Sequence, residues 1–466
     1  MDTVSLNEDD GALHQVHSCG FGKGYEARKR SKILDFSSTP IAEISLAPPI
    51  YVHELSSQAK SRKRLKLAEI QAAICEASDV FLNGTVCGLS PSQYMNLVHR
   101  ATGLPESTVQ HSIHYIGDAL EHISDTVQFS LPRGLCTDLI GKDAFEGTGI
   151  VSRRGDVLSV VAAGNGPGLH ALWPQAVALG YRVIIKPSNS EPFTAQRLVE
   201  SLSQVGLVDY VSLCCTDHKG VSTLLETTDL GIVYGGKKTV EQYAHQPNIL
   251  VQGPGHSKVV VTSEVNQQSA IKHTAECVMT LGGAACVSTS VVYVDGDVEE
   301  FATKLADYFK RSEYEKHYPK ASDSQIEAFK QTLNLSSSSG SFGFHTTHTD
   351  DGIIVKPYVD YSLGDSESLR HRELPFPCVS VLPLDRDNLP SQLKGSLAVS
   401  LYSTDVSVVE DVLQLSDIGN VYVGPIPTTW MSKHVPHDGY LAEFLTKARG
   451  YRIHKEWCIG EDFKSL

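Results

Sequence analysis

The 466-residue sequence has no apolar run approaching the roughly 20 residues that a membrane-spanning helix requires. Its first residues, MDTVSLNEDDG, are acidic and lack the apolar core of a secretory signal, so we expect a cytoplasmic protein. Positive charge is scarce, because 40 Lys and Arg oppose 54 Asp and Glu. The resulting net charge of −14 argues against nucleic acid or an anionic membrane as the main partner.

The ten cysteines do not show the paired spacing of a metal site, and we expect no bound metal. In a long chain without a secretory signal they are expected to be free thiols. The adjacent Cys214 and Cys215 end an apolar, strand-like run, and we interpret them as core residues. The length exceeds what one hydrophobic core usually supports, which predicts two large domains with room for a small third one.

From Gly155 onward, strand-like and helix-like patterns alternate. Near-continuous apolar runs in GDVLSVVAAGN, YRVIIKPS, DYVSLCC and DLGIVYGG are separated by helical segments. Such alternation predicts a parallel sheet with helices on both faces. A second α/β unit begins at SKVVVTS and includes an expected strand at 287–294. We therefore predict an α/β fold with two parallel-sheet domains.

The N-terminal third is less clearly patterned. Residues 1–48 are mixed and weakly patterned, and we expect much of this stretch to be loosely held. Residues 55–82 and 90–123 show helical periodicity, and in the second stretch Pro91 and Pro105 stand at the expected helix starts. Residues 127–154 are richer in glycine and β-formers, which predicts strands or a projecting hairpin.

Cys286 stands at the centre of the second unit, in TLGGAACVSTSVVYV. A helix over 270–281 is expected to end at two glycines, and a strand follows the cysteine. Because its N-terminal flank has almost no side-chain bulk, a substrate carbonyl could approach both the sulfur and nearby backbone N–H groups. The alternative is a small buried cysteine at a packed corner.

Other candidate residues follow the strands of the first unit, where ligands of parallel sheets bind. Asn165, in AAGNGPG, either donates its amide to an oxyanion or forms a structural turn. Lys186, in VIIKPSNS, either reaches a ribose or phosphate or simply faces solvent. Gly235 and Gly236, in VYGGKK, could admit a pyrophosphate to a helix N-terminus. Glu373, in RELPFP, is by itself compatible with an ordinary surface acid.

Taken together and in this order, these segments resemble the aldehyde dehydrogenase superfamily over about 149–438. The resemblance implies that Lys186 and Ser188 position the cofactor and that Gly235 and Gly236 lie on its phosphate side. QGPGH matches the family's hinge motif, and Glu373 matches the glutamate that holds the nicotinamide ribose. Gln252 and Cys286 are 34 residues apart, which is the family's spacing between general base and catalytic thiol.

The main departure from the family is Gln252, because the family's general base is a glutamate. Glutamine cannot accept a proton from water. Its presence protects a thioester from hydrolysis, and the chain looks most similar to LuxC-type acyl-CoA reductases. The resemblance thus implies NAD(P)H-dependent reduction of an acyl thioester, carried on coenzyme A or an acyl carrier protein, to an aldehyde. Cys286 would carry the acyl group, and Asn165 would hold the oxyanion.

Three alternatives remain open at this point. The first is an aldehyde dehydrogenase working in the oxidative direction, either CoA-acylating or hydrolytic. The second is an activity like that of glutamyl-phosphate reductase, with an acyl phosphate as substrate. The third is a non-catalytic relative that binds a nucleotide or a partner protein.

The resemblance also implies a cofactor preference and an assembly. Asn189 stands where many relatives carry an acidic residue that selects NAD, so we expect NADPH, with NADH as the alternative. We divide the chain into 1–255 (N-terminal helices, an arm at 127–154 and the cofactor domain), a catalytic domain at 256–435, and a tail at 436–466. The tail is expected to return to the oligomerisation and cofactor side, and a homodimer or homotetramer is expected, with 127–154 and 451–466 as pairing strands.

Overall fold

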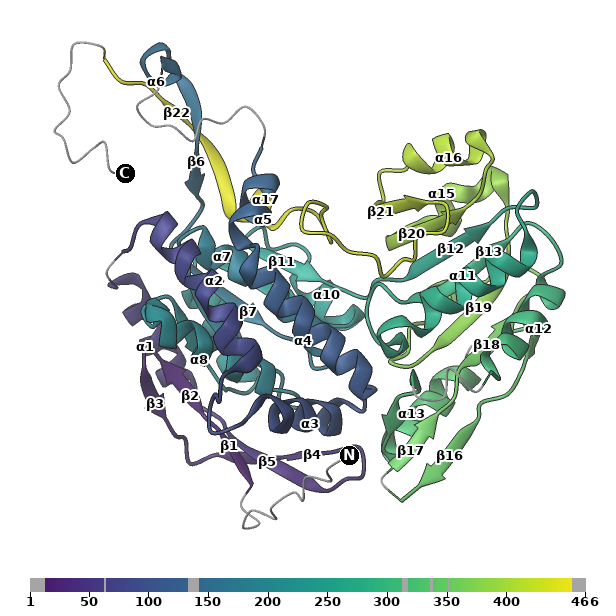
Figure 1. Cartoon of the computed structure of the whole chain (residues 1–466), viewed down its shortest axis with the longest axis horizontal. Coiled ribbons are helices and arrows are strands. Elements are labelled where there is room, and N and C mark those ends of the chain that lie inside the picture. The colour runs from purple at the N-terminus through teal and green to yellow at the C-terminus, as the bar shows by residue number, and fades with distance from the viewer. Residues whose placement is uncertain are drawn as a thin grey trace.

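The structure is a computed structural model, and it describes residues 13–62, 64–132, 142–311, 317–335, 338–350 and 352–454. Two α/β lobes lie side by side, and a narrow β arm projects from the N-terminal one (Figure 1). In the described part of the chain, no helix is both long and apolar enough to cross a membrane.

The first lobe is built on a seven-stranded sheet in the order β11-β10-β7-β8-β9-β2-β3. Its strands are β11 (Ile249–Gln252), β10 (Leu230–Tyr234), β7 (Val157–Val161), β8 (Arg182–Lys186), β9 (Val211–Leu213), β2 (Ser18–Gly20) and β3 (Lys23–Tyr25). The first five strands are parallel; β2 pairs antiparallel with β9, and β3 pairs antiparallel with β2. The predicted parallel sheet is confirmed.

Both faces of this sheet are covered, which explains the unbroken apolar runs of its strands. Successive side chains of a strand point to opposite faces. Val157 packs with α1 (Pro49–Lys60) and α9 (His218–Thr227). Leu158 joins the larger core on the other face. The helices on that second face are α2 (Leu67–Asn83), α4 (Glu106–Glu121), α7 (Pro174–Ala178) and α8 (Phe193–Leu202).

The prediction that residues 1–48 are loosely held is wrong for the described residues 13–48. Three strands, β1 (His14–Val16), β5 (Pro40–Ser45) and β4 (Arg30–Leu34), form a separate sheet with buried side chains. β2 extends the main sheet, where Cys19 is paired with Leu213. These strands are short, and their partners lie far along the chain, so no local periodicity revealed them.

The predicted hairpin at 127–154 is only partly correct. Helix α5 (Ile123–Ser130) continues through its start, and residues 133–141 lie outside the described part. After α6 (Lys142–Glu146), strand β6 (Thr148–Arg153) pairs antiparallel with β22 (Thr446–Tyr451) to form the arm. The C-terminal strand therefore lies before the expected segment 451–466, of which residues 455–466 are outside the described part.

The second lobe contains another seven-stranded sheet, in the order β15-β18-β19-β13-β12-β20-β21. Its strands are β15 (Gly340–Ser341), β18 (Tyr358–Tyr361), β19 (Cys378–Pro383), β13 (Thr289–Val294), β12 (Ser257–Val261), β20 (Ser396–Tyr402) and β21 (Ile418–Val423). All are parallel except β15. Helices α11 (Gln267–Met279) and α12 (Val298–Phe309) cover one face, and α15 (Leu389–Leu393) and α16 (Val406–Leu413) cover the other. The chain crosses from the first sheet to the second between Gln252 and Ser257.

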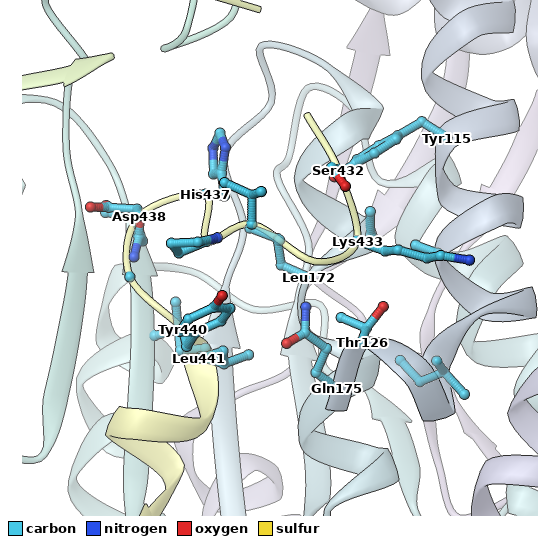
Figure 2. A pocket seen from close by; sticks show the side chains of 18 of the residues that line it. Tyr115, Thr126, Leu172, Gln175, Ser432, Lys433, His437, Asp438, Tyr440 and Leu441 are labelled. Atoms are coloured by element: carbon cyan, nitrogen blue, oxygen red, sulfur yellow. The ribbon is translucent and has the colours of Figure 1, made fainter. Parts of the chain in front are cut away.

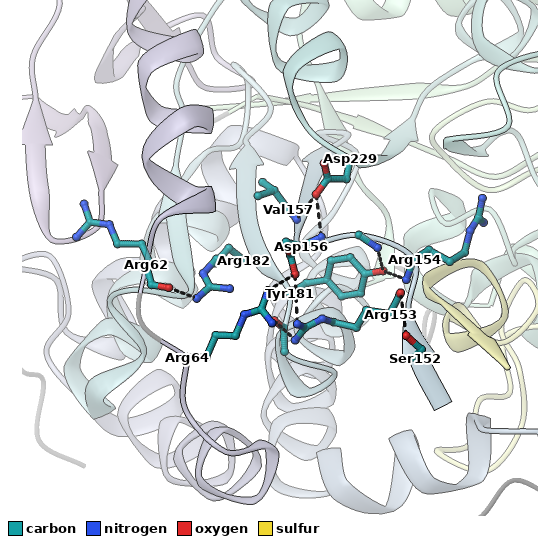
Figure 3. Close-up of polar contacts among 12 residues, drawn as sticks. Arg62, Arg64, Ser152, Arg153, Arg154, Asp156, Val157, Tyr181, Arg182 and Asp229 are labelled. Carbon is teal, nitrogen blue, oxygen red and sulfur yellow. Dashed lines mark hydrogen bonds and ion pairs between the residues drawn. The ribbon is translucent and has the colours of Figure 1, made fainter. Parts of the chain in front are cut away.

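Polar contacts gather around Tyr181 in the first lobe, beside Arg153 and Arg154 (Figure 3). The hydroxyl of Tyr181 accepts hydrogen bonds from the N–H groups of Arg154 and Gly155, and it donates to the carbonyl of Leu445 at 2.5 Å. Leu445 ends helix α17 (Leu441–Leu445). The end of α17, which follows the chain's return from the second lobe, is therefore held against the first lobe.

Candidate active site

Cys286 lies between α11 and β13, after a tight turn at Thr280–Gly283. Leu281, Gly282 and Gly283 all have positive φ angles, of 59°, 67° and 66°. This left-handed run turns the chain so that Cys286 faces the gap between the two lobes. The backbone N–H groups of Cys286 and Val287 lie near the sulfur and act to lower its pKa. The same N–H groups could receive developing negative charge on a substrate oxygen.

Two other loops pack directly against the cysteine loop, at distances that only glycine allows. A Cβ on Gly283 would lie 2.4 Å from the nitrogen of Pro377, in the ELPFP segment. A Cβ on Gly255, in QGPGH, would lie 1.8 Å from the carbonyl oxygen of Cys286. Ser257 Oγ donates to that carbonyl at 2.9 Å. The three motifs thus form one compact unit around the thiol.

Glu373 ties this unit together. Its Oε2 accepts hydrogen bonds from the N–H groups of Gly255 and His256, both at 3.0 Å. Burial raises the pKa of Glu373 above its ordinary value, and these two N–H donors oppose the shift. The preceding residue, Arg372, is held by a buried two-point ion pair with Asp360, with both N–O distances 2.7 Å. The short turn that carries Glu373 is therefore firmly fixed.

Asn165 reaches the cysteine loop from the first lobe. It follows β7, and its Nδ2 donates to the carbonyl of Ala284 at 3.1 Å. An amide nitrogen has two N–H groups, so this bond orients the side chain and leaves a second donor. The preceding Gly164 packs against the loop after β8, because a Cβ there would lie 2.3 Å from Ser188 Oγ.

A cavity of about 330 Å³ brings most of the predicted residues together. Six of them line it: Asn165, Gly235, Gly236, Gln252, Cys286 and Glu373. The other three, Lys186, Ser188 and Asn189, are not in this lining and lie at the neighbouring strand end, after β8. Burial lowers the pKa of Lys186, and the nearby Cys215 and Cys214 oppose that shift.

The thiol is not ionised by its surroundings. Burial, followed by the charges of Glu373 and Asp438, raises the pKa of Cys286 to about 12. At neutral pH the sulfur therefore carries its proton, and a base is needed when it attacks a carbonyl. Gln252, at the position where the family resemblance implies a base, cannot serve.

Two site residues were missed by sequence reasoning. His437 Nε2 lies 3.9 Å from Cys286 Sγ, and the neighbouring Asp438 accepts a hydrogen bond from the side chain of Gln252. Both belong to a loop without periodic pattern, more than 140 residues after the cysteine. The only local signal was a pair of titratable residues, in PHDG, within a segment that is otherwise polar and aromatic.

A second, smaller cavity of about 80 Å³ adjoins the first and shares Gln252 and His437 with it. Figure 2 shows the loop residues Ser432, Lys433, His437 and Asp438 around this space, together with Tyr115, Leu172 and Gln175 from the first lobe. Within the described part of the chain, no group of three or more His, Cys, Asp or Glu residues could hold a metal ion.

Comparison with known proteins agrees with this geometry. Residues 150–458, well over half of the chain, match the sequence model of the aldehyde dehydrogenase family.

The chain belongs to the aldehyde dehydrogenase family.

Similar proteins include the putative aldehyde dehydrogenase FUS7 of Gibberella fujikuroi, at 25% identity over 61% of this chain. The match spans 64% of that relative's length. The 2-hydroxymuconic semialdehyde dehydrogenase of Pseudomonas sp. is 22% identical over 72% of this chain and 78% of its own. Among solved structures, an NAD-dependent benzaldehyde dehydrogenase from Corynebacterium glutamicum aligns with a TM-score of 0.76 at 18% identity. That alignment covers 94% of this chain and 98% of the other. Lactaldehyde dehydrogenase from Escherichia coli gives 0.76 at 13% identity, covering 95% and 100%.

These matches confirm the superfamily and the α/β fold with two parallel-sheet domains. They also establish an oxidoreductase family as the context for Cys286. The resemblance to LuxC-type acyl-CoA reductases finds no specific support among them, because the relatives named above are aldehyde dehydrogenases.

Proposed function

We propose that this family member oxidises an aldehyde with a nicotinamide cofactor through a covalent intermediate on Cys286. The observation that carries the proposal is the cavity that Cys286, Asn165 and Glu373 line together. The names of the relatives support the oxidative direction over the reductive one that the sequence led us to expect.

The residues present fit a dinucleotide cofactor. A Cβ on Gly236 would meet no atom within 4 Å, so its backbone is open to a ligand, and Gly236 lines the cavity. Both bonds to Glu373 use Oε2, which leaves Oε1 to accept from a ribose hydroxyl. Lys186 supplies an ammonium at the end of β8. When bound, the nicotinamide accepts the hydride in the oxidative direction.

The protein's own groups would act in sequence. The sulfur of Cys286 attacks the aldehyde carbon and gives up its proton, while the carbonyl oxygen becomes an oxyanion. The second N–H of Asn165 and the backbone N–H of Cys286 are positioned to receive that oxyanion, and losing one such donor typically costs about 10²–10³ in rate. After hydride departure the acyl group remains on Cys286 as a thioester, which water or a thiol must then remove.

Acyl thioester reduction remains a second candidate, and Gln252 is the observation that favours it. A neutral amide at the position of the family's base, held by Asp438, provides no carboxylate to activate water at that point. An acyl group delivered by coenzyme A or an acyl carrier protein would then persist on Cys286 until it is reduced to the aldehyde. A CoA-acylating dehydrogenase is the same reaction in reverse.

One set of assays separates these functions. The purified protein is given a panel of aliphatic and aromatic aldehydes with NAD⁺ or NADP⁺, with and without coenzyme A, and in parallel acyl-CoA with NADPH or NADH. Free acid formed without coenzyme A would support hydrolytic aldehyde oxidation. Acyl-CoA formed only with coenzyme A, or aldehyde formed from acyl-CoA, would favour the second candidate. No hydride transfer in any arm would overturn both.

A further inference from the structure

The Cys286 thiol must lose a proton before its sulfur can attack. Gln252 cannot accept that proton, and the surroundings of the sulfur raise its pKa rather than lower it. We propose that His437 is the base that takes the proton from Cys286, in place of the carboxylate that Gln252 lacks. This inference depends on the proposed function only where it concerns the rate of catalytic turnover. The proton transfer itself can be tested without substrate or cofactor.

The geometry singles out His437. Its Nε2 is 3.9 Å from Cys286 Sγ, which is within reach of a long hydrogen bond to sulfur. The backbone around it is fixed, because Asn420 Nδ2 donates both to the carbonyl of His437, at 2.5 Å, and to that of Leu397, at 3.1 Å. Asn420 is part of β21, so the second lobe, which also carries Cys286, holds the imidazole in place.

The charge state of the imidazole suits a proton acceptor. Burial lowers the pKa of His437, so the ring is neutral at pH 7 and has a lone pair to offer. The carboxyl of Asp438 acts in the opposite direction and stabilises the ring once it is protonated. Gln252 hydrogen-bonds the same carboxyl and thereby positions it.

Other titratable groups around the pair do not compete for the role. Glu373 is occupied by two backbone N–H groups, and its charge raises the pKa of Cys286 rather than lowering it. Burial raises the pKa of Tyr234, so its phenol stays protonated at neutral pH. His111 and Tyr115, on α4, line the same cavity, but no hydrogen bond joins either of them to Cys286.

The attack of Cys286 on the carbonyl needs no further reagent once His437 accepts the proton. As the sulfur forms its bond to the carbonyl carbon, the S–H proton passes to Nε2 of His437 and the carbonyl π electrons move to oxygen. The resulting imidazolium lies beside Asp438. Once hydride has left and the acyl-enzyme stands, the imidazole returns its proton to solvent and is neutral again for the next turnover.

The test is the pH profile of Cys286 alkylation by iodoacetamide in the full-length protein, without substrate or cofactor, followed by peptide mass spectrometry. With His437 as base, the wild-type rate should already have reached its plateau at neutral pH, because burial lowers the pKa of the imidazole, and it should fall only at more acidic pH as the ring becomes protonated. His437→Gln should show no plateau. Its rate should climb about tenfold per pH unit from pH 6 to 9 and lie at least about tenfold below wild type at pH 7.

Two internal comparisons sharpen the result. His434→Gln removes an exposed imidazole three residues away, one that packs at a tilt against Phe129 with ring centroids 3.9 Å apart, and it should leave the profile unchanged. Cys277 also lies against a histidine, with Sγ 3.5 Å from His273 Nε2, but it is fully buried and should stay unmodified in the folded protein.

Either of two outcomes would overturn the proposal. One is a wild-type rate that climbs tenfold per pH unit over the whole range, a result that needs no variant. The other is a His437→Gln protein that loses the same factor at every pH, which would indicate a packing role. Failure of aldehyde oxidation, by contrast, would overturn the proposed function and leave the alkylation result standing.

Discussion

Gly255 lies so close to Cys286 that a side chain at this glycine would overlap the cysteine backbone. A Cβ would be 1.8 Å from the carbonyl oxygen of Cys286 and 3.0 Å from its Cα. The hinge between the two lobes therefore touches the loop that bears the thiol, and the N–H of Gly255 is also one of the two donors to Glu373.

Gly255→Ala should consequently disturb the site more than the fold. Overpacking typically costs about 1–3 kcal/mol of stability, and the displaced backbone would move Cys286 and Glu373 together. We expect a lower melting temperature and loss of most of the activity. Gly364→Ala, at a position with nothing within 4 Å, is the matched control and should behave like wild type. Unchanged turnover in Gly255→Ala would mean that the close contact does not set the position of the thiol.

Gln252→Glu tests whether the missing carboxylate protects the acyl-enzyme. A positioned general base typically contributes about 10²–10⁴-fold, so the variant should hydrolyse acyl-CoA to free acid without cofactor, faster than wild type by a factor in that range. The new carboxyl would lie beside Asp438, and two neighbouring carboxyls raise one another's pKa, so the gain should grow as the pH rises above neutral.

The control for Gln252→Glu is Gln175→Glu, which adds the same charge in the adjoining smaller cavity and should form no acid. Rapid hydrolysis of acyl-CoA by the wild type would contradict the protective role of Gln252. It would agree instead with a water-activating role for His437.

Asn189→Glu tests the cofactor preference. Asn189 is exposed after β8, three residues beyond Lys186, and its neutral side chain does not repel a 2′-phosphate. We expect the wild type to use NADP(H) at least as well as NAD(H). The variant should raise the KM for the phosphorylated cofactor about tenfold or more and spare the other, because two like charges would meet. An equal loss of activity with both cofactors would mean that Asn189 does not lie near the 2′ position of the cofactor's ribose.

The arm formed by β6 and β22 indicates that the protein forms an oligomer. β6 and β22 pair only with each other in the described part of the chain, and a two-stranded ribbon is marginal by itself and leaves open edges. We expect a homodimer or a dimer of dimers in which this ribbon pairs with a second copy. Light scattering over a series of micromolar concentrations should give a multiple of the 50.7 kDa chain mass. A monomer throughout would contradict the expectation.

The limits of sequence-based prediction are clearest at particular residues. Buried parallel strands such as Val157–Val161 were predictable, because both faces are covered and the run is apolar throughout. Asn165, Gln252 and Cys286 were predictable as candidates, because each stands at the end of a strand or in a glycine turn next to one. Their convergence came from the family resemblance and not from local pattern.

The strands of residues 13–45 and the pair His437–Asp438 were not predictable in this way. Strand β2 has three residues, and its partner Leu213 is nearly 200 positions away. His437 reaches the thiol only because its loop is anchored at one end by Asn420 in the second lobe and at the other by Tyr181 in the first. Such contacts leave no trace in hydrophobic periodicity.

The central claim is that Cys286 carries the substrate as a covalent acyl group. It is tested most directly by mixing the protein with aldehyde and oxidised cofactor, quenching with acid within the first turnover, and measuring peptide masses. The account predicts an acyl mass on the Cys286 peptide, no such mass on the Cys277 peptide, and none anywhere in Cys286→Ser, which should fold and bind cofactor normally. Turnover of aldehyde by Cys286→Ser at near wild-type rate, or an adduct on a different cysteine, would contradict it.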